Sequence, residues 1–208
     1  MRKLLAAEAA MWRNLFLWLR RRPVELGEGD RAFGYLGGVK MILIFFICFS
    51  AFEIPLFDVI VAHVVPWRPA RWIVLGLGAW GLLWMIGLYA GLKLHPHVVT
   101  RAALRVRLSN GVDVTLPWES IASVTKRVRP LASGKSVQEL DGALHVVVNS
   151  QTNVDVRLHE VETLVTGKAP TAELRLYADD ADGLVTEARS RLAALAETGS
   201  PARARPAA

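Results

Sequence analysis

The chain has 208 residues, 52% of them hydrophobic, and 25 Lys and Arg against 19 Asp and Glu, for a net charge of +6. Its single cysteine, Cys48, excludes an intrachain disulfide framework and a cysteine-based zinc site. The basic residues do not form one stripe with interleaved aromatic side chains, so the excess charge indicates contact with anionic lipid headgroups rather than nucleic acid. We therefore expect no nucleic-acid partner, no cofactor and no metal.

The N-terminal segment is predicted to be a helix followed by a linker. Residues 1–22 carry apolar side chains at helical spacing and end in three arginines. Two interpretations stay open: an amphipathic helix lying on the membrane surface, or a short helix packed on a soluble domain. Residues 23–38 are rich in glycine and lack periodicity, which predicts a linker that completes an N-terminal region of residues 1–40.

Two long apolar segments follow, at residues 41–65 and 72–92, with only a short connection between them. At a rise of about 1.5 Å per residue, each covers roughly 30 Å or more, the thickness of the hydrocarbon core of a bilayer. The pair is predicted to form a two-span transmembrane α-hairpin over residues 41–94. Cations are more numerous on either side of the pair than between its segments, which predicts that both termini lie in the cytoplasm.

Three polar residues interrupt the first apolar segment: Glu53 near its middle, then Asp58 and His63. A charge at mid-bilayer is costly, so Glu53 must be protonated, paired or hydrated. Pro55 removes a backbone donor and favours a kink beside it. Two interpretations stay open for Glu53: a structural hydrogen bond between helices, or an intramembrane polar site with Asp58 and His63.

The second apolar segment contains a pair of small residues, Gly87 and Gly91, at a spacing of four. Small residues at this spacing let two helices approach closely. The pair predicts a helix-packing surface, which is either the face of a homo-oligomer or the place where the two spans of one chain pack.

The pattern changes to period two after residue 97, which predicts strands. A three-residue loop that ends at Gly111, in the left-handed conformation, places Leu104 opposite Leu116 and Arg107 opposite Asp113. This register keeps the apolar side chains on one face and pairs opposite charges on the other. We therefore predict a hairpin with this loop rather than a two-residue turn.

A second hairpin is predicted from residues 144–148 and 154–158, with their six alternating apolar side chains on one face. Residues 121–128 and 173–177 are expected to form further strands. A helix is expected from about Asp182. Its core-facing stripe has helical spacing and consists of Leu184, Val185, Ala188, Leu192 and Leu195.

The segment LRVRL, followed by VTLPWESIASV directly after a two-span hairpin, resembles the membrane-attached bacterial pleckstrin-homology-like proteins. The residues that carry the resemblance are Pro117, Trp118, Ile121 and Val124, with the terminal helix. The resemblance implies an antiparallel pleckstrin-homology-like sheet or partial barrel with a C-terminal helix, in a cytoplasmic α+β domain of residues 98–197. It also implies binding or assembly rather than catalysis, and a location in a bacterial plasma (inner) membrane. Residues 198–208 are expected to be a disordered tail.

A basic run, Lys126, Arg127 and Arg129, follows the strand expected after the first hairpin. It is interpreted either as a solvated strand edge or as a contact with anionic lipid headgroups. His95 and His97 lack enough neighbouring ligands for a zinc site. The sequence contains no motif of a catalytic or phosphate-cradling loop, so no catalytic residues are assigned.

These patterns predict a non-catalytic integral membrane protein with a cytoplasmic binding or assembly domain. The alternative is an accessory or oligomeric subunit that uses Glu53 and Asp58 for proton or ion transfer or for contact with a partner helix. The expected partners are the lipid bilayer, anionic lipid headgroups, and either a second copy of the chain or another membrane protein.

Overall fold

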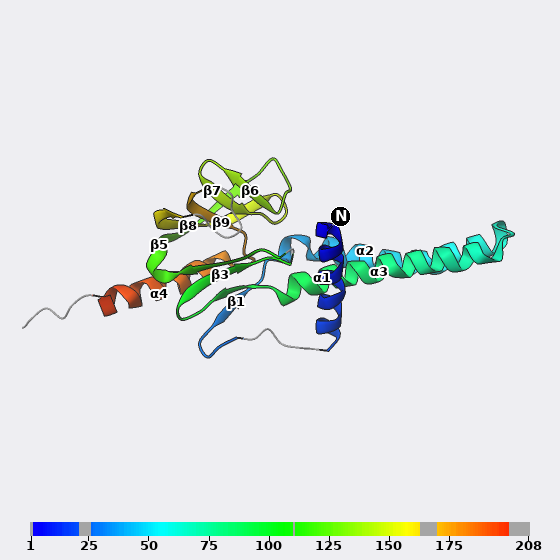
Figure 1. Ribbon diagram of the computed structural model, residues 1–208, viewed down its shortest axis with the longest axis horizontal. Coiled ribbons are helices and arrows are strands. Elements are labelled where there is room, and N and C mark those ends of the chain that lie inside the picture. The colour runs from blue at the N-terminus through cyan, green and yellow to red at the C-terminus, as the bar shows by residue number, and fades with distance from the viewer. Residues whose placement is uncertain (1, 21–25, 110, 163–169, 200–208) are drawn as a thin grey trace, which may run out of the picture. The chain divides into compact units, whose positions relative to one another are not determined.

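The computed structural model describes four stretches of the chain: residues 2–20, 26–109, 111–162 and 170–199. They form two compact units, which we call the helical unit (Met1–Val24 and Leu36–His95) and the sheet unit (Glu25–Tyr35 and Pro96–Ala208). Figure 1 shows the elements of both units, which are treated separately below. Asn110 of the predicted loop and the predicted tail from residue 200 onward lie outside the described residues.

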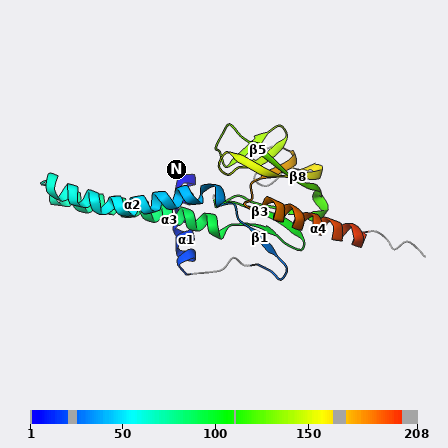
Figure 2. The same cartoon turned by 180° about the vertical axis from the view of Figure 1, so that it is seen from behind.

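The helical unit contains α1 (Arg2–Leu19), α2 (Gly37–Val64) and α3 (Arg68–Leu94). Helices α2 and α3 form the predicted hairpin and run side by side in Figures 1 and 2. With 28 and 27 residues, each is roughly 40 Å long at the α-helical rise, which exceeds the thickness of the hydrocarbon core. Pro55 lies inside α2 without ending it.

The hairpin exposes apolar side chains along most of its length. No residue of α2 is buried, and Phe45 and Phe52 are 63% and 72% exposed. Water would make such a surface unfavourable, because each large apolar side chain costs roughly 1.5–3 kcal/mol to expose. Both helices are long and apolar enough to cross a membrane, and their largely unburied surfaces are consistent with membrane insertion.

The first sheet of the sheet unit has the order β1-β2-β3-β4, and all its neighbours are antiparallel. Its strands are β1 (Arg31–Phe33), β2 (His97–Val99), β3 (Ala103–Arg107) and β4 (Asp113–Pro117). Strand β1 lies in the segment expected to be a linker, so that expectation is corrected for residues 31–33. A three-residue strand is too short to show periodicity. Its partner is β2, with Phe33 opposite His97, and β2 follows the helical hairpin in the sequence.

The predicted hairpin of β3 and β4 is confirmed in its register. Leu104 pairs with Leu116, and Arg107 pairs with Asp113. The amide of Leu108 donates to the carbonyl oxygen of Val112 at 2.9 Å. Gly111 has a φ of +93°, the left-handed conformation that its position in the loop requires.

The second sheet has the order β5-β8-β9-β7-β6. Its strands are β5 (Ile121–Pro130), β6 (Val137–Leu140), β7 (Ala143–Val146), β8 (Gln151–Glu162) and β9 (Thr171–Leu176). A 3-10 turn, η1 (Trp118–Ser120), joins the two sheets, and α4 (Ala181–Gly199) ends the described chain. The predicted α+β class is confirmed, as two open sheets and a C-terminal helix, with one departure from an all-antiparallel arrangement: β7 and β9 are parallel.

The predicted second hairpin is wrong in its pairing. Strand β9 lies between β7 and β8, so Leu144 is next to Leu174 instead of a residue of β8. Only Val148 and Gln151 bridge the two segments, around a two-residue turn. The six apolar side chains are nevertheless buried as expected, because alternation selects a face of the sheet and leaves the neighbouring strand open.

The core of the sheet unit lies between the inner faces of the sheets and α4. Leu184 and Ala188 of α4 are fully buried. Helix α4 contacts β2 of the first sheet and both β5 and β8 of the second, so it holds the two open sheets together.

A buried polar cluster ties β1, β2 and β3 to the connection before α4. The ring of His97 is fully buried, donates from Nε2 to the Tyr177 carbonyl oxygen at 3.0 Å and accepts at Nδ1 from the amide of Arg107 at 3.2 Å. It stacks on Tyr35, whose hydroxyl accepts a hydrogen bond from the amide of Ser109 at 3.0 Å. Burial lowers the pKa of His97 to about 4 and raises the pKa of Tyr35 to about 12, so both are neutral in the folded chain at neutral pH.

We predict that the sheet unit folds without the hairpin when residues 36–95 are replaced by a short Gly-Ser connection. The fragment 98–197, which lacks β1 and His97, should be less stable by several kcal/mol, because burial of Phe33 and Tyr35 contributes roughly 1.5–3 kcal/mol each. Urea unfolding followed by circular dichroism measures the difference. Equal midpoints for the two proteins would show that β1 contributes nothing to stability.

We predict that acid destabilises the sheet unit through His97. The unfolded chain binds a proton near pH 6.5, whereas folded His97 binds one only near pH 4. Between these values the unfolded state holds more protons, so the free energy of unfolding falls as the pH falls, by at most about 1.4 kcal/mol per pH unit from this residue. Urea titrations across this range should show a shallower pH slope in His97→Gln, and an unchanged slope would contradict the assignment.

Candidate functional site

The polar residues of the helical hairpin do not form one site. Asp58 of α2 accepts two hydrogen bonds from Arg71 of α3, from Nε at 2.6 Å and from Nη2 at 2.7 Å. The ring of His63 donates from Nδ1 to the Val59 carbonyl oxygen of its own helix. Within the described part of the chain, Glu53 makes no hydrogen bond or ion pair. Asp58 is therefore paired across the hairpin with Arg71, whereas no described residue pairs with Glu53.

The small residues of α3 form a packing surface for α1. Gly87 and Gly91 are buried, and a Cβ atom on Gly87 would lie 3.0 Å from the Met11 carbonyl oxygen. Trp12 of α1 packs edge-on against Trp80, with 4.8 Å between ring centroids. The contact of Gly87 is thus with α1, a neighbour that neither of the two alternatives suggested by the spacing had named. It places α1 in the helical unit, where Figures 1 and 2 show it steeply crossing the hairpin.

The basic run of β5 is divided between the two faces of the sheet. Lys126 Nζ contacts the Asp182 carboxylate at the start of α4, at 2.6 Å. Arg129 donates to Asp155 of β8, on the outer face, with its closest contact at 2.9 Å. Arg127 has no hydrogen bond or ion pair among the described residues. The side chains expected to contact lipid as a group therefore have three different environments.

The outer face of the second sheet carries a polar recess, which we call the arginine-lined hollow. It has a volume of about 170 Å³ and is lined by Ser123, Thr125, Arg127, Arg129, Asp155, Arg157 and Glu173. The register of β5, β8 and β9 creates it, since Ser123 lies beside Arg157, and Arg157 beside Glu173. The apolar residues between these positions face the core.

Arginines and carboxylates alternate across the hollow. Arg175 binds Glu173 through Nη2 at 2.6 Å and Nε at 2.9 Å, and Arg157 approaches the same carboxylate at 3.3 Å. Burial pushes the pKa of Glu173 upward, but the hydrogen bonds and charges of Arg175 and Arg157 together outweigh burial, so the pKa lies below its ordinary value. A hydrogen bond to Asp155 raises the pKa of Arg129. Glu173 and Arg129 are therefore both charged at neutral pH.

His145 of β7 extends this network beneath the outer face. It is 3% exposed, and Arg175 Nη1 lies 3.2 Å from its Nε2. A guanidinium can only donate, so Nε2 accepts and the ring is neutral. Burial and then the charge of Arg175 lower the pKa of His145. The histidine thus supports the position of Arg175 without adding charge to the face.

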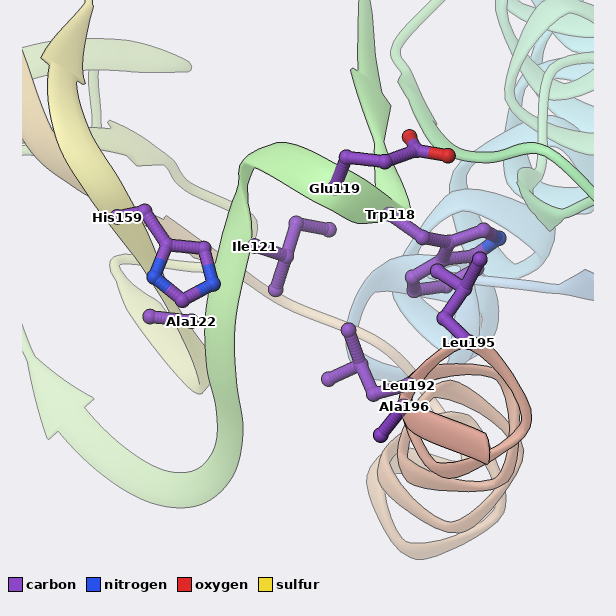
Figure 3. A pocket seen from close by; sticks show the side chains of 8 residues that line it. All are labelled: Trp118, Glu119, Ile121, Ala122, His159, Leu192, Leu195 and Ala196. Atoms are coloured by element: carbon purple, nitrogen blue, oxygen red, sulfur yellow. The ribbon is translucent and has the colours of Figure 1, made fainter. Parts of the chain in front are cut away.

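A second recess, which we call the apolar groove, lies between β5, η1 and the last turns of α4 (Figure 3). Its volume is about 550 Å³, and it is lined by Trp118, Glu119, Ile121, Ala122, His159, Leu192, Leu195 and Ala196. Figure 3 shows the two leucines pointing from α4 toward Trp118 and Ile121, while the carboxylate of Glu119 points away from them. Trp118 is held by its indole N–H, which donates to the Thr100 carbonyl oxygen at 3.1 Å.

The groove corrects the expectation that the whole apolar stripe of α4 faces the core. Leu184 and Ala188 are buried, but Leu192 and Leu195 are only half-buried, because α4 extends beyond the sheets at this end. The groove and the hollow share strand β5, where Ala122 lines one and Ser123 the other. Within the described residues there is no group of three or more metal-ligating side chains.

We predict that Gly87→Leu displaces α1 from α3, whereas Gly81→Leu leaves it in place. A side chain at Gly87 would collide with the backbone of α1, and Gly81 faces open space. In a chain carrying Asn14→Cys, whose position is 3% exposed in the α1–α3 contact, a water-soluble maleimide measures the displacement. Labelling should increase only with Gly87→Leu. Equal labelling of both leucine variants would contradict the packing surface.

Comparison of the chain with protein-family models, curated proteins and solved structures found no match. The function must therefore be inferred from the two recesses and the helical hairpin themselves.

Proposed function

We propose that this is an integral membrane protein that holds a non-catalytic binding and assembly module at the cytoplasmic face of a bacterial inner membrane. The observation that carries the proposal is the apolar groove. An open recess lined by leucines, isoleucine and tryptophan suits an amphipathic segment of a protein partner, which would bury its apolar face there. Such a surface recognises and holds a ligand without reacting with it.

The membrane attachment is supported by the exposed apolar surface of the hairpin. Helix α2 presents large apolar side chains to its surroundings along most of its length, and α3 does so as far as Trp84. Cations are more numerous before α2 and after α3 than in the connection between these helices. This bias supports a cytoplasmic location for the sheet unit, which continues the chain after α3. The Asp58–Arg71 ion pair would then lie toward the outer interface, where water reduces the cost of its charges.

The resemblance to pleckstrin-homology-like proteins is part of the same proposal. It is supported by the succession of antiparallel strands followed by one C-terminal helix that packs on both sheets. The parallel pairing of β7 with β9 and the contribution of β1 from before the hairpin are departures from the expected pattern. The binding role does not depend on them, because the groove is built by η1, β5 and α4.

The alternative of an intramembrane polar path has less support. Arg71 already occupies both carboxylate oxygens of Asp58, which leaves that residue unavailable for a path with Glu53. The first hairpin also offers little to an anionic headgroup, because Asp113 binds Arg105 through two hydrogen bonds. Binding through the sheet unit is therefore the function that the described residues favour.

We predict that Ala196→Arg abolishes partner binding while Ala193→Arg does not. Both alanines are exposed on α4, so neither arginine disturbs the core, but only position 196 lines the groove. The tagged full-length variants would be purified from native membranes under identical conditions, and the retained proteins quantified by mass spectrometry. The proposal expects proteins retained by the wild type and by Ala193→Arg to be lost with Ala196→Arg. Identical sets from both variants would refute the groove as the binding surface.

A further inference from the structure

We propose that the arginine-lined hollow is a binding site for a phosphate group, carried either by a lipid headgroup or by a soluble phosphorylated molecule. The hollow lies on the outer face of the second sheet and shares no lining residue with the apolar groove. The proposal therefore goes beyond partner binding in the groove and stands on separate observations.

The first observation is a surplus of positive charge. Four arginines surround two carboxylates on this face: Arg127, Arg129, Arg157 and Arg175 around Asp155 and Glu173. Counting charges gives +4 − 2 = +2, and His145 adds none because its ring is neutral. A phosphate monoester carries close to two negative charges at neutral pH, which would complete the balance.

The second observation is the supply of unused donors. Arg127 has no hydrogen bond or ion pair within the described part of the chain, and neither do the hydroxyl groups of Ser123 and Thr125. These three side chains stand at alternate positions of β5 and line the same recess. They offer a guanidinium fork and two hydroxyl donors to one acceptor-rich ligand.

The third observation is that the remaining arginines are held in place. Asp155 and Glu173 are 10% and 17% exposed and fix Arg129 and Arg175 through short hydrogen bonds. Arginines fixed in this way lose less conformational freedom when a ligand arrives. The carboxylates thus position Arg129 and Arg175, while Arg127 is exposed and Arg157 is 68% exposed, so both can reach a ligand in the hollow.

The size and lining of the hollow favour a phosphate group over a nucleic-acid strand. Its volume of about 170 Å³ is roughly six times the share of one water molecule in the liquid, which accommodates a single tetrahedral anion. No aromatic side chain lines it, so it offers no platform for stacking bases. Planar arginine forks match the oxygen geometry of phosphate better than point charges would.

The test uses the full-length protein in nanodiscs of phosphatidylcholine. In one arm, glycerol 3-phosphate is titrated and the heat of binding measured. In the other arm, the nanodiscs are mixed with phosphatidylcholine vesicles that contain or lack phosphatidic acid, and co-flotation is measured. Saturable binding in the first arm alone identifies a soluble ligand, and binding in the second arm alone identifies a lipid headgroup. Binding in both arms shows recognition of the phosphate group itself, and all three results support the site.

The double variant Arg127→Gln/Arg157→Gln should weaken binding by roughly tenfold or more, because two charge-assisted hydrogen bonds are lost. Thr125→Val should weaken it by a smaller factor. Arg101→Gln removes one charge from an exposed residue outside the hollow and should leave binding unchanged, as should Ala196→Arg in the groove. Circular dichroism verifies that each variant is folded. No saturable binding in either arm, or an equal loss with Arg101→Gln, would overturn the proposal.

Discussion

The pairing of β1 with β2 is the constraint on which the arrangement of the chain depends. These strands are hydrogen-bonded neighbours, with Phe33 opposite His97, although the entire helical hairpin lies between them in the sequence. The hairpin therefore takes the place of the loop in an ordinary β-hairpin. Helices α2 and α3 must bring the chain from the end of β1 back to the start of β2. Their nearly equal lengths of 28 and 27 residues do so. Within the sheet unit, the stacked rings of Tyr35 and His97 join the segment before the hairpin to the segment after it.

The parts of the fold that could be predicted are those where local chemistry allows one solution. Two long apolar segments with a short connection can only form an antiparallel pair, and the helices are found there. The loop before Val112 was predictable because three constraints agree: a buried apolar face, the Arg107–Asp113 pairing and a glycine where φ is positive. Such agreement between independent constraints made the register unique.

The remaining parts depend on contacts that are distant in the sequence. Alternation in β7 and β8 correctly placed their apolar residues inside, but it could not show that β9 inserts between them. The hollow was missed for the same reason. Asp155 and Arg157 on β8 and Glu173 and Arg175 on β9 have alternating charges, a signal visible in the sequence. Its meaning emerges only when Arg157 is known to pair with Glu173. The groove likewise could not be predicted, because the sequence does not show where α4 extends beyond the sheets.

The contrast between the two sheets explains why charge accumulates on the second. Its inner face packs into the core against α4. Among the described residues of the sheet unit no helix lies over its outer face, which must be polar to remain exposed. Opposite charges in adjacent strands stabilise such a face, and the long arginine side chains cover the backbone between them. Full pairing would need as many carboxylates as arginines, yet four arginines share only Asp155 and Glu173. In the first hairpin, Arg105 and Arg107 likewise share one carboxylate, Asp113. The second sheet differs in its unused donors, because the side chains of Ser123, Thr125 and Arg127 line one recess and make no hydrogen bond or ion pair among the described residues. These donors argue for an anionic ligand on this face.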